Sequence, residues 1–420
     1  MASLLESDEP GIRDAEARRN ARLYLIGLGA SLLGNSALSL VAGIWVKSLT
    51  GSSSEAGLVS VCIYLPLMFG PLAGLAADRA RRRPFLITVN LASAAVVLVL
   101  LLVRSAAQLW LIYAVMLGYG MSLALIDPAE SALFAVMLPD RIRQRANGIR
   151  LALQEGGRLI APLAGAGLFE LLGGGVVAAL DAATFVIAAL VLTRLRLTED
   201  KPVREPQHWR AELVAGLTFI RSVSLLRIAL AAAAVAMFIS GMEVAAPYSL
   251  VSALHRPPSF LGVLTAVLGA GSIVASLTSG WLVNRLGEHR LALLGLVNGV
   301  LGNLLVTVGG LVGALAGFFV FGFWLPWTVV AVINLSQRLT PSELQGRVAA
   351  ALTFLLFAPQ PLAQTAGAAI IGQVSYRYVY IGAAIACLAT ACWLGVRSRG
   401  LAGADAKQGD EAGPGRPNSS

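Results

Sequence analysis

Twelve apolar runs, each long enough to cross a lipid bilayer, follow one another along this chain with short polar connections between them. A helix needs about 20 residues to span the hydrocarbon core of a membrane. In that core the backbone polar groups must bond within their own segment, so isolated runs of this kind fold as helices. The sequence therefore predicts an all-α polytopic membrane protein. The expected transmembrane helices cover residues 22–46, 56–77, 84–104, 108–137, 146–172, 174–194, 226–252, 259–283, 291–311, 314–337, 348–373 and 377–397.

The composition agrees with a membrane protein and argues against several other classes. Only 13% of the 420 residues are charged and 57% are hydrophobic, whereas about a quarter of a soluble protein is charged. The three cysteines, Cys62, Cys387 and Cys392, lie inside apolar runs without metal-binding spacing, so we expect no metal and no other cofactor. The absence of a G-x-x-x-x-G-K-[ST] phosphate loop and of any nucleophile–base spacing disfavours a primary pump and an enzyme.

The net charge of the chain is +9, and the basic residues are concentrated in alternate connections between the apolar runs. Loops rich in arginine and lysine stay on the cytoplasmic side of a membrane. Both chain ends are therefore expected in the cytoplasm, with the protein in the plasma (inner) membrane, and a nucleic-acid partner is disfavoured. The expected cytoplasmic arginines are Arg79, Arg81, Arg82, Arg83, Arg141, Arg143, Arg145, Arg285, Arg290, Arg338, Arg347 and those from Arg194 to Arg210.

A polar stretch in the middle of the chain, LTEDKPVREPQHWR, divides it into two halves of six spans each. The segment after it reads as an amphipathic helix at the cytoplasmic interface. The last residues are rich in Gly, Pro, Ser and charge, which is typical of disorder. The expected parts are a cytoplasmic N-terminal segment at 1–21, a six-helix bundle at 22–196, a linker with the amphipathic helix at 197–224, a second bundle at 225–398 and a disordered cytoplasmic tail at 399–420.

Three short patterns occur twice, about 200 residues apart, which indicates that the halves are repeats. Six spans per half give both halves the same orientation, so we expect a parallel repeat about an axis along the membrane normal. The matched patterns are Gly74-x-x-x-Asp78-Arg79 with Gly280-x-x-x-Asn284-Arg285, Pro139 and Arg145 with Pro341 and Arg347, and Pro162-Leu163-Ala164 with Pro361-Leu362-Ala363.

The stretch GLAADRARRRP, from Gly74 to Pro84, resembles the signature turn G-x-x-x-D-R-x-G-R-R of the major facilitator superfamily, with Arg81 in place of the second glycine. The connections LPDRIRQRANG and TPSELQGRVAA are similar to the macrolide-efflux and enterobactin-exporter-like branch of that family. The resemblance covers roughly residues 20 to 398. It implies a secondary active transporter that works by alternating access, with export of a drug or siderophore-like molecule as the expected direction.

The resemblance also implies a cytoplasmic latch at the signature turn, in which Asp78 holds a neighbouring helix end and an arginine. The alternative is that these charges only fix the orientation in the membrane. In the fifth span, GRLIAPLAGAG is similar to the antiporter motif G-x-x-x-G-P-x-x-G-G. The residues concerned are Gly74, Asp78, Arg79, Arg82, Arg83 and Arg145 for the latch, and Gly157, Pro162 and Gly165 for the antiporter-like motif.

Ionisable residues inside the expected spans are candidates for proton coupling, because charge at membrane depth is costly. Counted from the connection at Pro139 to Arg145, Asp127 and Arg158 lie at similar depths, and Glu130 matches Glu155 one turn nearer the cytoplasm. This spacing predicts three carboxylates around Arg158. A surplus of acids favours one carboxyl that keeps a proton. The alternative is a static ion-pair network between the two helices.

Glu243, followed by the helix-breaking Pro247, is a further proton-coupling candidate in the seventh span. Amide side chains inside the spans either line a substrate cavity or hold helices together by hydrogen bonds. The cavity candidates are Asn35, Asn334, Gln337, Gln360 and Gln364.

We therefore expect a proton-coupled exporter of a small hydrophobic or amphipathic molecule. Its partners would be the small-molecule substrate, protons and the lipid bilayer, and it would function as a monomer. An uptake permease of the same fold and a non-transporting membrane receptor or scaffold are the alternatives. The sequence does not identify the substrate.

Overall fold

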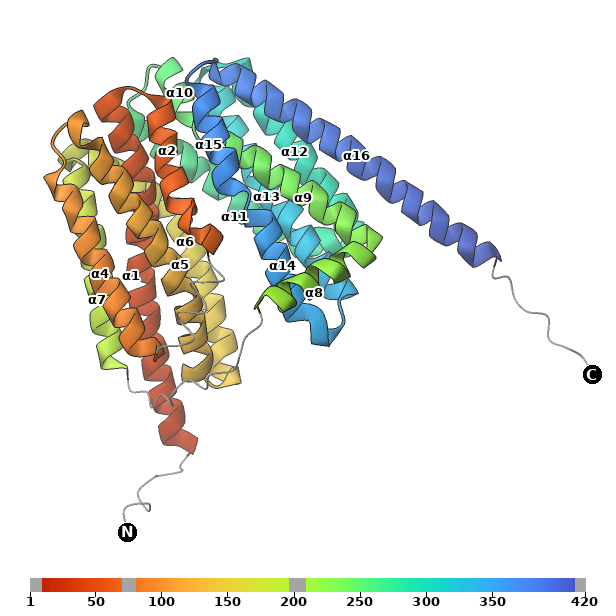
Figure 1. The fold of residues 1–420 in the computed structure, drawn as a ribbon, viewed down its shortest axis with the longest axis horizontal. Coiled ribbons are helices and arrows are strands. Elements are labelled where there is room, and N and C mark those ends of the chain that lie inside the picture. The colour runs from red at the N-terminus through yellow and green to blue at the C-terminus, as the bar shows by residue number, and fades with distance from the viewer. Residues whose placement is uncertain (1–9, 70–80, 196–208, 412–420) are drawn as a thin grey trace, which may run out of the picture. The chain divides into compact units, whose positions relative to one another are not determined.

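The computed structural model describes residues 10–69, 81–195 and 209–411. All regular elements in these ranges are helices (Figure 1). The first half of the chain contains α1 (Pro10–Thr50), α2 (Ser53–Tyr64), α4 (Arg82–Leu98), α5 (Leu109–Met137), α6 (Asp140–Leu172) and α7 (Gly174–Arg194). The second contains α8 (Trp209–Ser222), α9 (Ser224–Met242), α10 (Ala246–Ala253), α11 (Leu261–Leu286), α12 (Glu288–Val308), α13 (Gly310–Leu339), α14 (Gln345–Phe357), α15 (Gln360–Ile371) and α16 (Tyr376–Glu411).

Ten helical stretches among the described residues are long and apolar enough to cross a membrane. Two expected spans are outside this set. The second span, of which α2 and the 3₁₀ turn η1 (Pro66–Phe69) are described, extends beyond the described residues. The fifth span, α6, is 33 residues long but carries Arg150, Glu155 and Arg158, which lower its mean hydropathy.

Two expected spans are each built from two helices. The seventh is divided into α9 and α10 by a turn at Glu243–Ala245, next to Pro247. The eleventh is divided into α14 and α15 at Ala358–Pro359. A proline removes an N–H donor and clashes with the preceding turn, so both breaks have a local cause. The last helix, α16, continues to Glu411, into the segment whose composition predicts disorder.

The described residues form two compact units, which do not coincide with the two halves of the chain. The first unit contains those of Met1–Gln207, together with Val244–Gly269 and Pro361–Tyr376 from the second half. The second unit contains those of His208–Glu243, Ala270–Gln360 and Arg377–Ser420. The seventh, eighth and eleventh spans each contribute to both units.

In the first unit, α1 packs against α6 and α7 over much of its length (Figure 1). Glycines permit this close approach: a Cβ built on Gly165 of α6 would lie 2.8 Å from the Cβ of Ala37 on α1. Small residues are the usual means of helix association in lipid, where no hydrophobic effect drives helices together. Because α1 contacts α5, α6 and α7, its polar residues lie next to residues of all three helices.

The parts of the second half that belong to the first unit pack on the first half through small residues. The Ser54 hydroxyl of α2 donates a hydrogen bond to the Ala368 carbonyl of α15. A Cβ built on Gly57 would lie 2.6 Å from the Cβ of Ala245, so no larger residue fits there. Four such contacts, which we call the small-residue seam, pair Ser54 with Ala368, Gly57 with Ala245, Gly43 with Tyr248 and Gly262 with Ala166. The charge distribution of the sequence predicts that Ser54 and Ala368 lie at the outer side of the membrane.

In the second unit, α12 and α13 form a closely packed helix pair, and the amphipathic helix α8 packs on α14. The apolar side of α8 joins a cluster that includes Ile220, Val348 and Leu352. A Cβ built on Gly216 would overlap the Arg347 carbonyl oxygen, so α8 touches the backbone of α14 directly. The apolar residues of α8 therefore contact protein.

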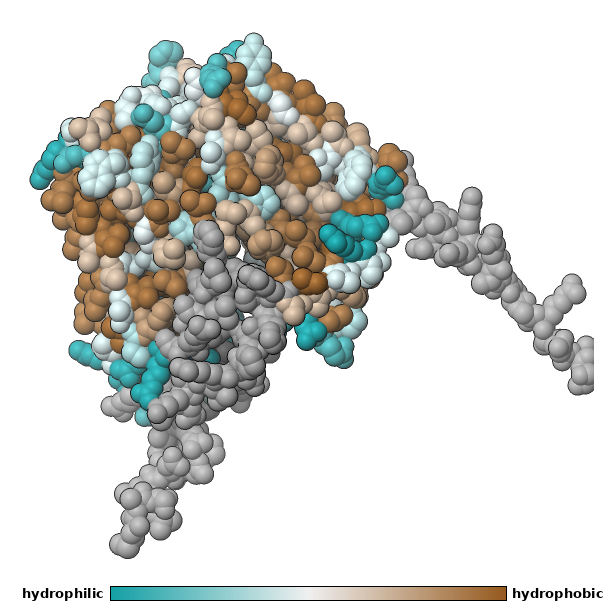
Figure 2. Space-filling view, viewed as in Figure 1, coloured by the Kyte–Doolittle hydropathy of each residue, from teal (hydrophilic) through white to brown (hydrophobic). Residues whose placement is uncertain are grey.

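Large hydrophobic side chains remain exposed along the helices. Leu171 and Leu277 are each 79% exposed and Val308 is 81% exposed. On the face that Figure 2 shows, hydrophobic residues cover most of the helix surface and hydrophilic ones gather near helix ends. A soluble protein rarely exposes apolar patches of this extent. The surface therefore suits a lipid environment.

Candidate functional site

The signature turn lies largely outside the described residues, which exclude Gly74, Asp78 and Arg79. Arg82 and Arg83 are described and open α4. Arg83 Nε donates to the Leu192 carbonyl at 2.8 Å, and Arg83 Nη2 donates to the Thr193 carbonyl at 2.6 Å. A cation at a helix C-terminus satisfies free carbonyls and interacts well with the helix dipole. Arg83 thus fastens the start of α4 to the end of α7.

The remaining latch candidate, Arg145, lies on α6, close to its start.

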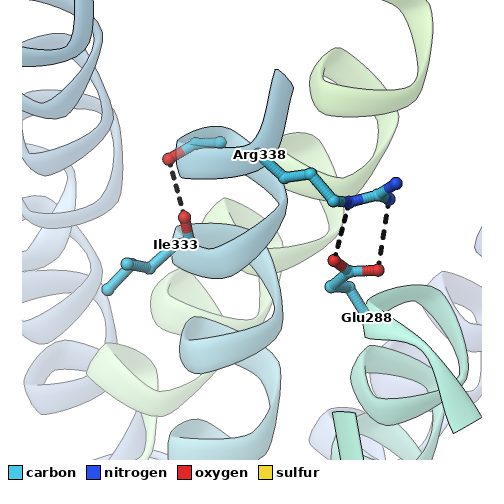
Figure 3. Close-up of polar contacts among 4 residues, drawn as sticks. Glu288, Ile333 and Arg338 are labelled. Carbon is cyan, nitrogen blue, oxygen red and sulfur yellow. Dashed lines mark hydrogen bonds and ion pairs between the residues drawn. The ribbon is translucent and has the colours of Figure 1, made fainter. Parts of the chain in front are cut away.

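The second unit contains an ion pair near the repeat of the signature turn, which ends at Asn284 and Arg285. Glu288, four residues after Asn284, accepts a bidentate pair from Arg338 of α13, with distances of 2.9 Å to Nε and 3.2 Å to Nη2 (Figure 3). A bidentate arginine–carboxylate pair fixes geometry better than a single contact. The pair joins the first turn of α12 to the last turn of α13.

The four charged candidates on α5 and α6 divide into two groups. Arg158 Nη1 lies 3.3 Å from Glu155 Oε1 on the same helix, and the Arg158 side chain is 62% exposed. Asp127 and Glu130 of α5 instead interact electrostatically with Arg150 of α6. The prediction that all three carboxylates surround Arg158 is therefore wrong.

The reason is the length of the connection between α5 and α6. The sequence prediction counted the depth of α6 from Arg145, but α6 begins at Asp140, directly after Pro139. The six residues from Asp140 to Arg145 add about 9 Å of helix. Counted from Pro139, Arg150 lies as deep as Asp127, and Arg158 lies about two turns further on.

Tyr24 of α1 completes the group around Arg150. Its side chain is only 3% exposed, it packs against Phe134 with ring centroids 5.4 Å apart, and its hydroxyl interacts with the Glu130 carboxyl. We call Tyr24, Asp127, Glu130 and Arg150 the acidic cluster. Sequence reasoning missed Arg150, although it is an ionisable residue inside an expected span. Tyr24 carries no charge and gave no comparable signal.

The antiporter-like residues of α6 serve close packing on two sides. Gly165 contacts α1 at Ala37, as described above. Near Pro162, a Cβ built on Gly262 of α11 would lie 3.0 Å from the Pro162 carbonyl oxygen. Gly157 is buried but has more room, since its nearest neighbour is Leu32 Cβ at 3.9 Å from a built Cβ. The motif therefore lies between α1 and the start of α11.

Glu243 lies at the break between α9 and α10, where it is 8% exposed. It interacts with the side chain of Asn303 on α12 and lies near Cys387 of α16. Its Oε1 atom is buried without a hydrogen-bond partner. A buried carboxyl with a free oxygen, at a point where a helix is interrupted, can bind and release a proton.

The amide candidates for a substrate cavity differ in exposure. Gln360 is 8% exposed and its Nε2 donates to the Met237 carbonyl at 2.8 Å, so it bonds α15 to α9. Gln364 is also buried. Asn35 and Asn334 are partly exposed and Gln337 is exposed. The two buried glutamines thus agree with the hydrogen-bonding alternative.

Comparisons with known proteins agree with this architecture. The family model of the Major Facilitator Superfamily matches residues 24–248 and 228–417. Macrolide efflux protein A of Streptococcus pyogenes is 22% identical over 382 residues, covering 87% of this chain and 93% of the relative. The multi-drug resistance efflux pump PmrA of Streptococcus pneumoniae is 26% identical over 388 residues, covering 89% and 94%.

Solved transporter structures share the fold at low identity. A variant of the nucleoside transporter NupG superposes with a TM-score of 0.73 at 13% identity, covering 90% of this chain and 99% of the other. A bacterial homologue of the iron transporter ferroportin, solved in an inward-facing state, has a TM-score of 0.71 at 14% identity, covering 90% and 98%. These likenesses concern the fold alone.

Proposed function

The chain belongs to the Major Facilitator Superfamily, so it is a membrane transporter and not an enzyme, and we propose that it exports a small hydrophobic or amphipathic molecule in exchange for protons. In this proposal twelve helices form two repeated bundles that alternate access between the two sides of the plasma membrane, with both termini in the cytoplasm. A single chain performs the cycle.

The observation that carries the proton-coupling proposal is the composition of the acidic cluster. Two carboxyls, the exposed Asp127 and the partly buried Glu130, interact electrostatically with one guanidinium, Arg150. All three lie inside expected spans, where an unpaired charge is costly. One carboxyl can be neutralised by Arg150, whereas the other gains from holding a proton. Such a site changes charge when it exchanges a proton for a conformational change or for substrate.

The direction and the substrate class are supported by the relatives. Macrolide efflux protein A and PmrA carry export in their names, and this chain covers nearly their whole length. The antiporter-like face of α6, packed against α1 and α11, agrees with an exchanger. The uptake permease would have the same fold and differs from the exporter in its response to the direction of the pH gradient.

The test uses the full-length protein in inside-out membrane vesicles, with a labelled macrolide, erythromycin, as the probe. Acidifying the vesicle lumen should drive accumulation, and Asp127→Asn or Glu130→Gln should reduce that drive by roughly 5- to 150-fold, the usual range of a coupling free energy between two sites. The matched control is Glu170→Gln, which changes an exposed carboxyl on α6. Accumulation driven by the opposite gradient would indicate an uptake permease.

The same vesicles test the latch at the signature turn. Asp78→Asn should slow transport while leaving probe binding to the purified protein unchanged, because a latch biases conformation and not affinity. Loss of binding with a normal transport rate would contradict the latch.

The three single variants Asp127→Asn, Glu130→Gln and Glu155→Gln test the coupling site. Wild-type pH-driven transport in all three would exclude these carboxyls of α5 and α6 as the coupling site.

A further inference from the structure

Asp181 of α7 is a carboxyl group that the acidic cluster does not include. Its side chain is 0% exposed, and its Oδ2 atom is buried without a hydrogen-bond partner. It packs against α1 so closely that a Cβ on Gly34 would overlap Asp181 Oδ1. Among the described residues, no lysine, arginine or histidine interacts with this carboxyl.

The hydroxyl groups around Asp181 already use their protons elsewhere. Thr184 Oγ1 donates to the Asp181 backbone carbonyl at 2.8 Å and lies at the longer distance of 3.4 Å from Oδ1. Ser39 of α1 donates to the Asn35 carbonyl at 2.7 Å. A hydroxyl has only one proton to donate. Tyr119 of α5 lies near Asp181, but its hydroxyl is buried without a hydrogen-bond partner among the described residues, so it does not donate to this carboxyl.

An ionised carboxylate with only the long contact to Thr184 and no cation would be strongly disfavoured inside the protein. A carboxylic acid fits the same surroundings better, because it carries no charge and its O–H can donate to the lone pairs of Thr184 Oγ1. We infer that Asp181 is a second proton-binding site of the first unit, separate from the acidic cluster, and that it holds its proton in the conformation described. This inference rests on the proposed proton coupling for its role in transport.

The site has a connection to the acidic cluster through α1. Gly34, which contacts Asp181, lies ten residues after Tyr24, so the two sites are about 15 Å apart along the helix. Asn35, directly after Gly34, has a buried Oδ1 atom without a partner. The same helix, α1, thus packs against both carboxyl sites.

The experiment is an infrared pH titration of the purified, reconstituted full-length protein, which needs no substrate. One component of the protonated-carboxyl band should be present in wild type, in the control Glu170→Gln and in Glu130→Gln, and should be absent from Asp181→Asn. This component should disappear at high pH while the protein stays folded. Tyr119→Phe, which removes the neighbouring hydroxyl, should shift this band. A band unchanged in Asp181→Asn, or one that titrates only on unfolding, would overturn the inference.

Transport in proteoliposomes then tests the role of the site. Asp181→Asn should reduce the pH-driven accumulation of labelled erythromycin by roughly 5- to 150-fold. Exchange of erythromycin without a pH gradient should continue. A wild-type pH profile in Asp181→Asn would make Asp181 a purely structural acid. Absence of pH-driven transport in the wild type would instead refute the proposed function, and the infrared titration would still decide whether Asp181 binds a proton.

Discussion

Arg150 decides how the charges of the first unit are balanced. It is the cation that faces Asp127 and Glu130, whereas Arg158 pairs with Glu155 on its own helix. A guanidinium keeps its proton under all ordinary conditions and can contact two carboxyls with its planar donors. In the proposed proton coupling, Arg150 is therefore the cation that neutralises one of the two carboxyls.

Arg150→Gln should abolish most of the pH-driven export, with a loss of roughly 5- to 150-fold, because both carboxyls then lack a cation. Arg150→Lys should retain part of the activity, since it keeps the charge without the planar donors. Vesicle accumulation of labelled erythromycin is the measurement.

The contrasting variant is Arg158→Gln. Its effect should be the smaller one, because the ion pair that it removes is exposed and such pairs contribute little. A larger loss in Arg158→Gln than in Arg150→Gln would show that the coupling cation has been assigned to the wrong arginine.

At the scale of the helices, ten of the expected spans correspond to described helical stretches long and apolar enough to cross a membrane, but the sequence did not predict every interruption or register. The ends of α7 and α12 agree with the apolar runs at 174–194 and 291–311 to within a few residues. The α5–α6 register was missed because charged residues such as Arg141 and Arg145 mark a polar segment without showing that it is already helical. The link between Tyr24 and Glu130 depends on how α1 packs, which hydrophobic patterning does not specify.

The contact between α8 and α14 gives a prediction for an element. Gly216→Val should displace α8, because its Cβ would overlap the Arg347 carbonyl and lie 2.9 Å from Ala351 Cβ. We expect a loss of about 1–3 kcal/mol in the stability of the second unit, as for other overpacked cores. Thermal unfolding of the purified protein measures it.

Gly346→Val, on α14 itself, is the matched control, because a Cβ there meets nothing within 4 Å. Equal destabilisation by both substitutions would mean that valine is poorly tolerated in this region for reasons other than the α8 contact.

For the whole molecule, the sequence repeats predicted two halves, whereas the compact units divide three spans between them. The repeated patterns follow the order of the chain. They do not reveal that Val244–Gly269 and Pro361–Tyr376 pack on the first half, because that packing depends on small residues scattered over separate helices. Gly57, Ala245 and Ala368 meet in space but share no motif.

The small-residue seam allows a direct test of alternating access. A Cβ built on Gly372 lies 3.7 Å from Ser54 Cβ, and disulfides have Cβ atoms about 3.8 Å apart. Ser54→Cys combined with Gly372→Cys, in a chain with its three native cysteines replaced, should crosslink on oxidation. Export should then stop and should return on reduction.

Each single-cysteine variant is the control and should stay active in oxidant. Full export by the crosslinked protein would contradict a cycle in which this seam has to open.

The seam also determines how the membrane potential acts on the cycle. Its four described contacts involve hydroxyl, methyl, aromatic and glycine groups and include no charged side chain. A step that moves no charge through the field does no electrical work, whereas each elementary charge that crosses contributes about 2.3 kcal/mol per 100 mV. Separation of the seam should therefore be electrically silent, and the Ser54–Gly372 cysteine pair should crosslink at the same rate with or without an imposed voltage. The voltage dependence of export would then arise where protons bind and leave.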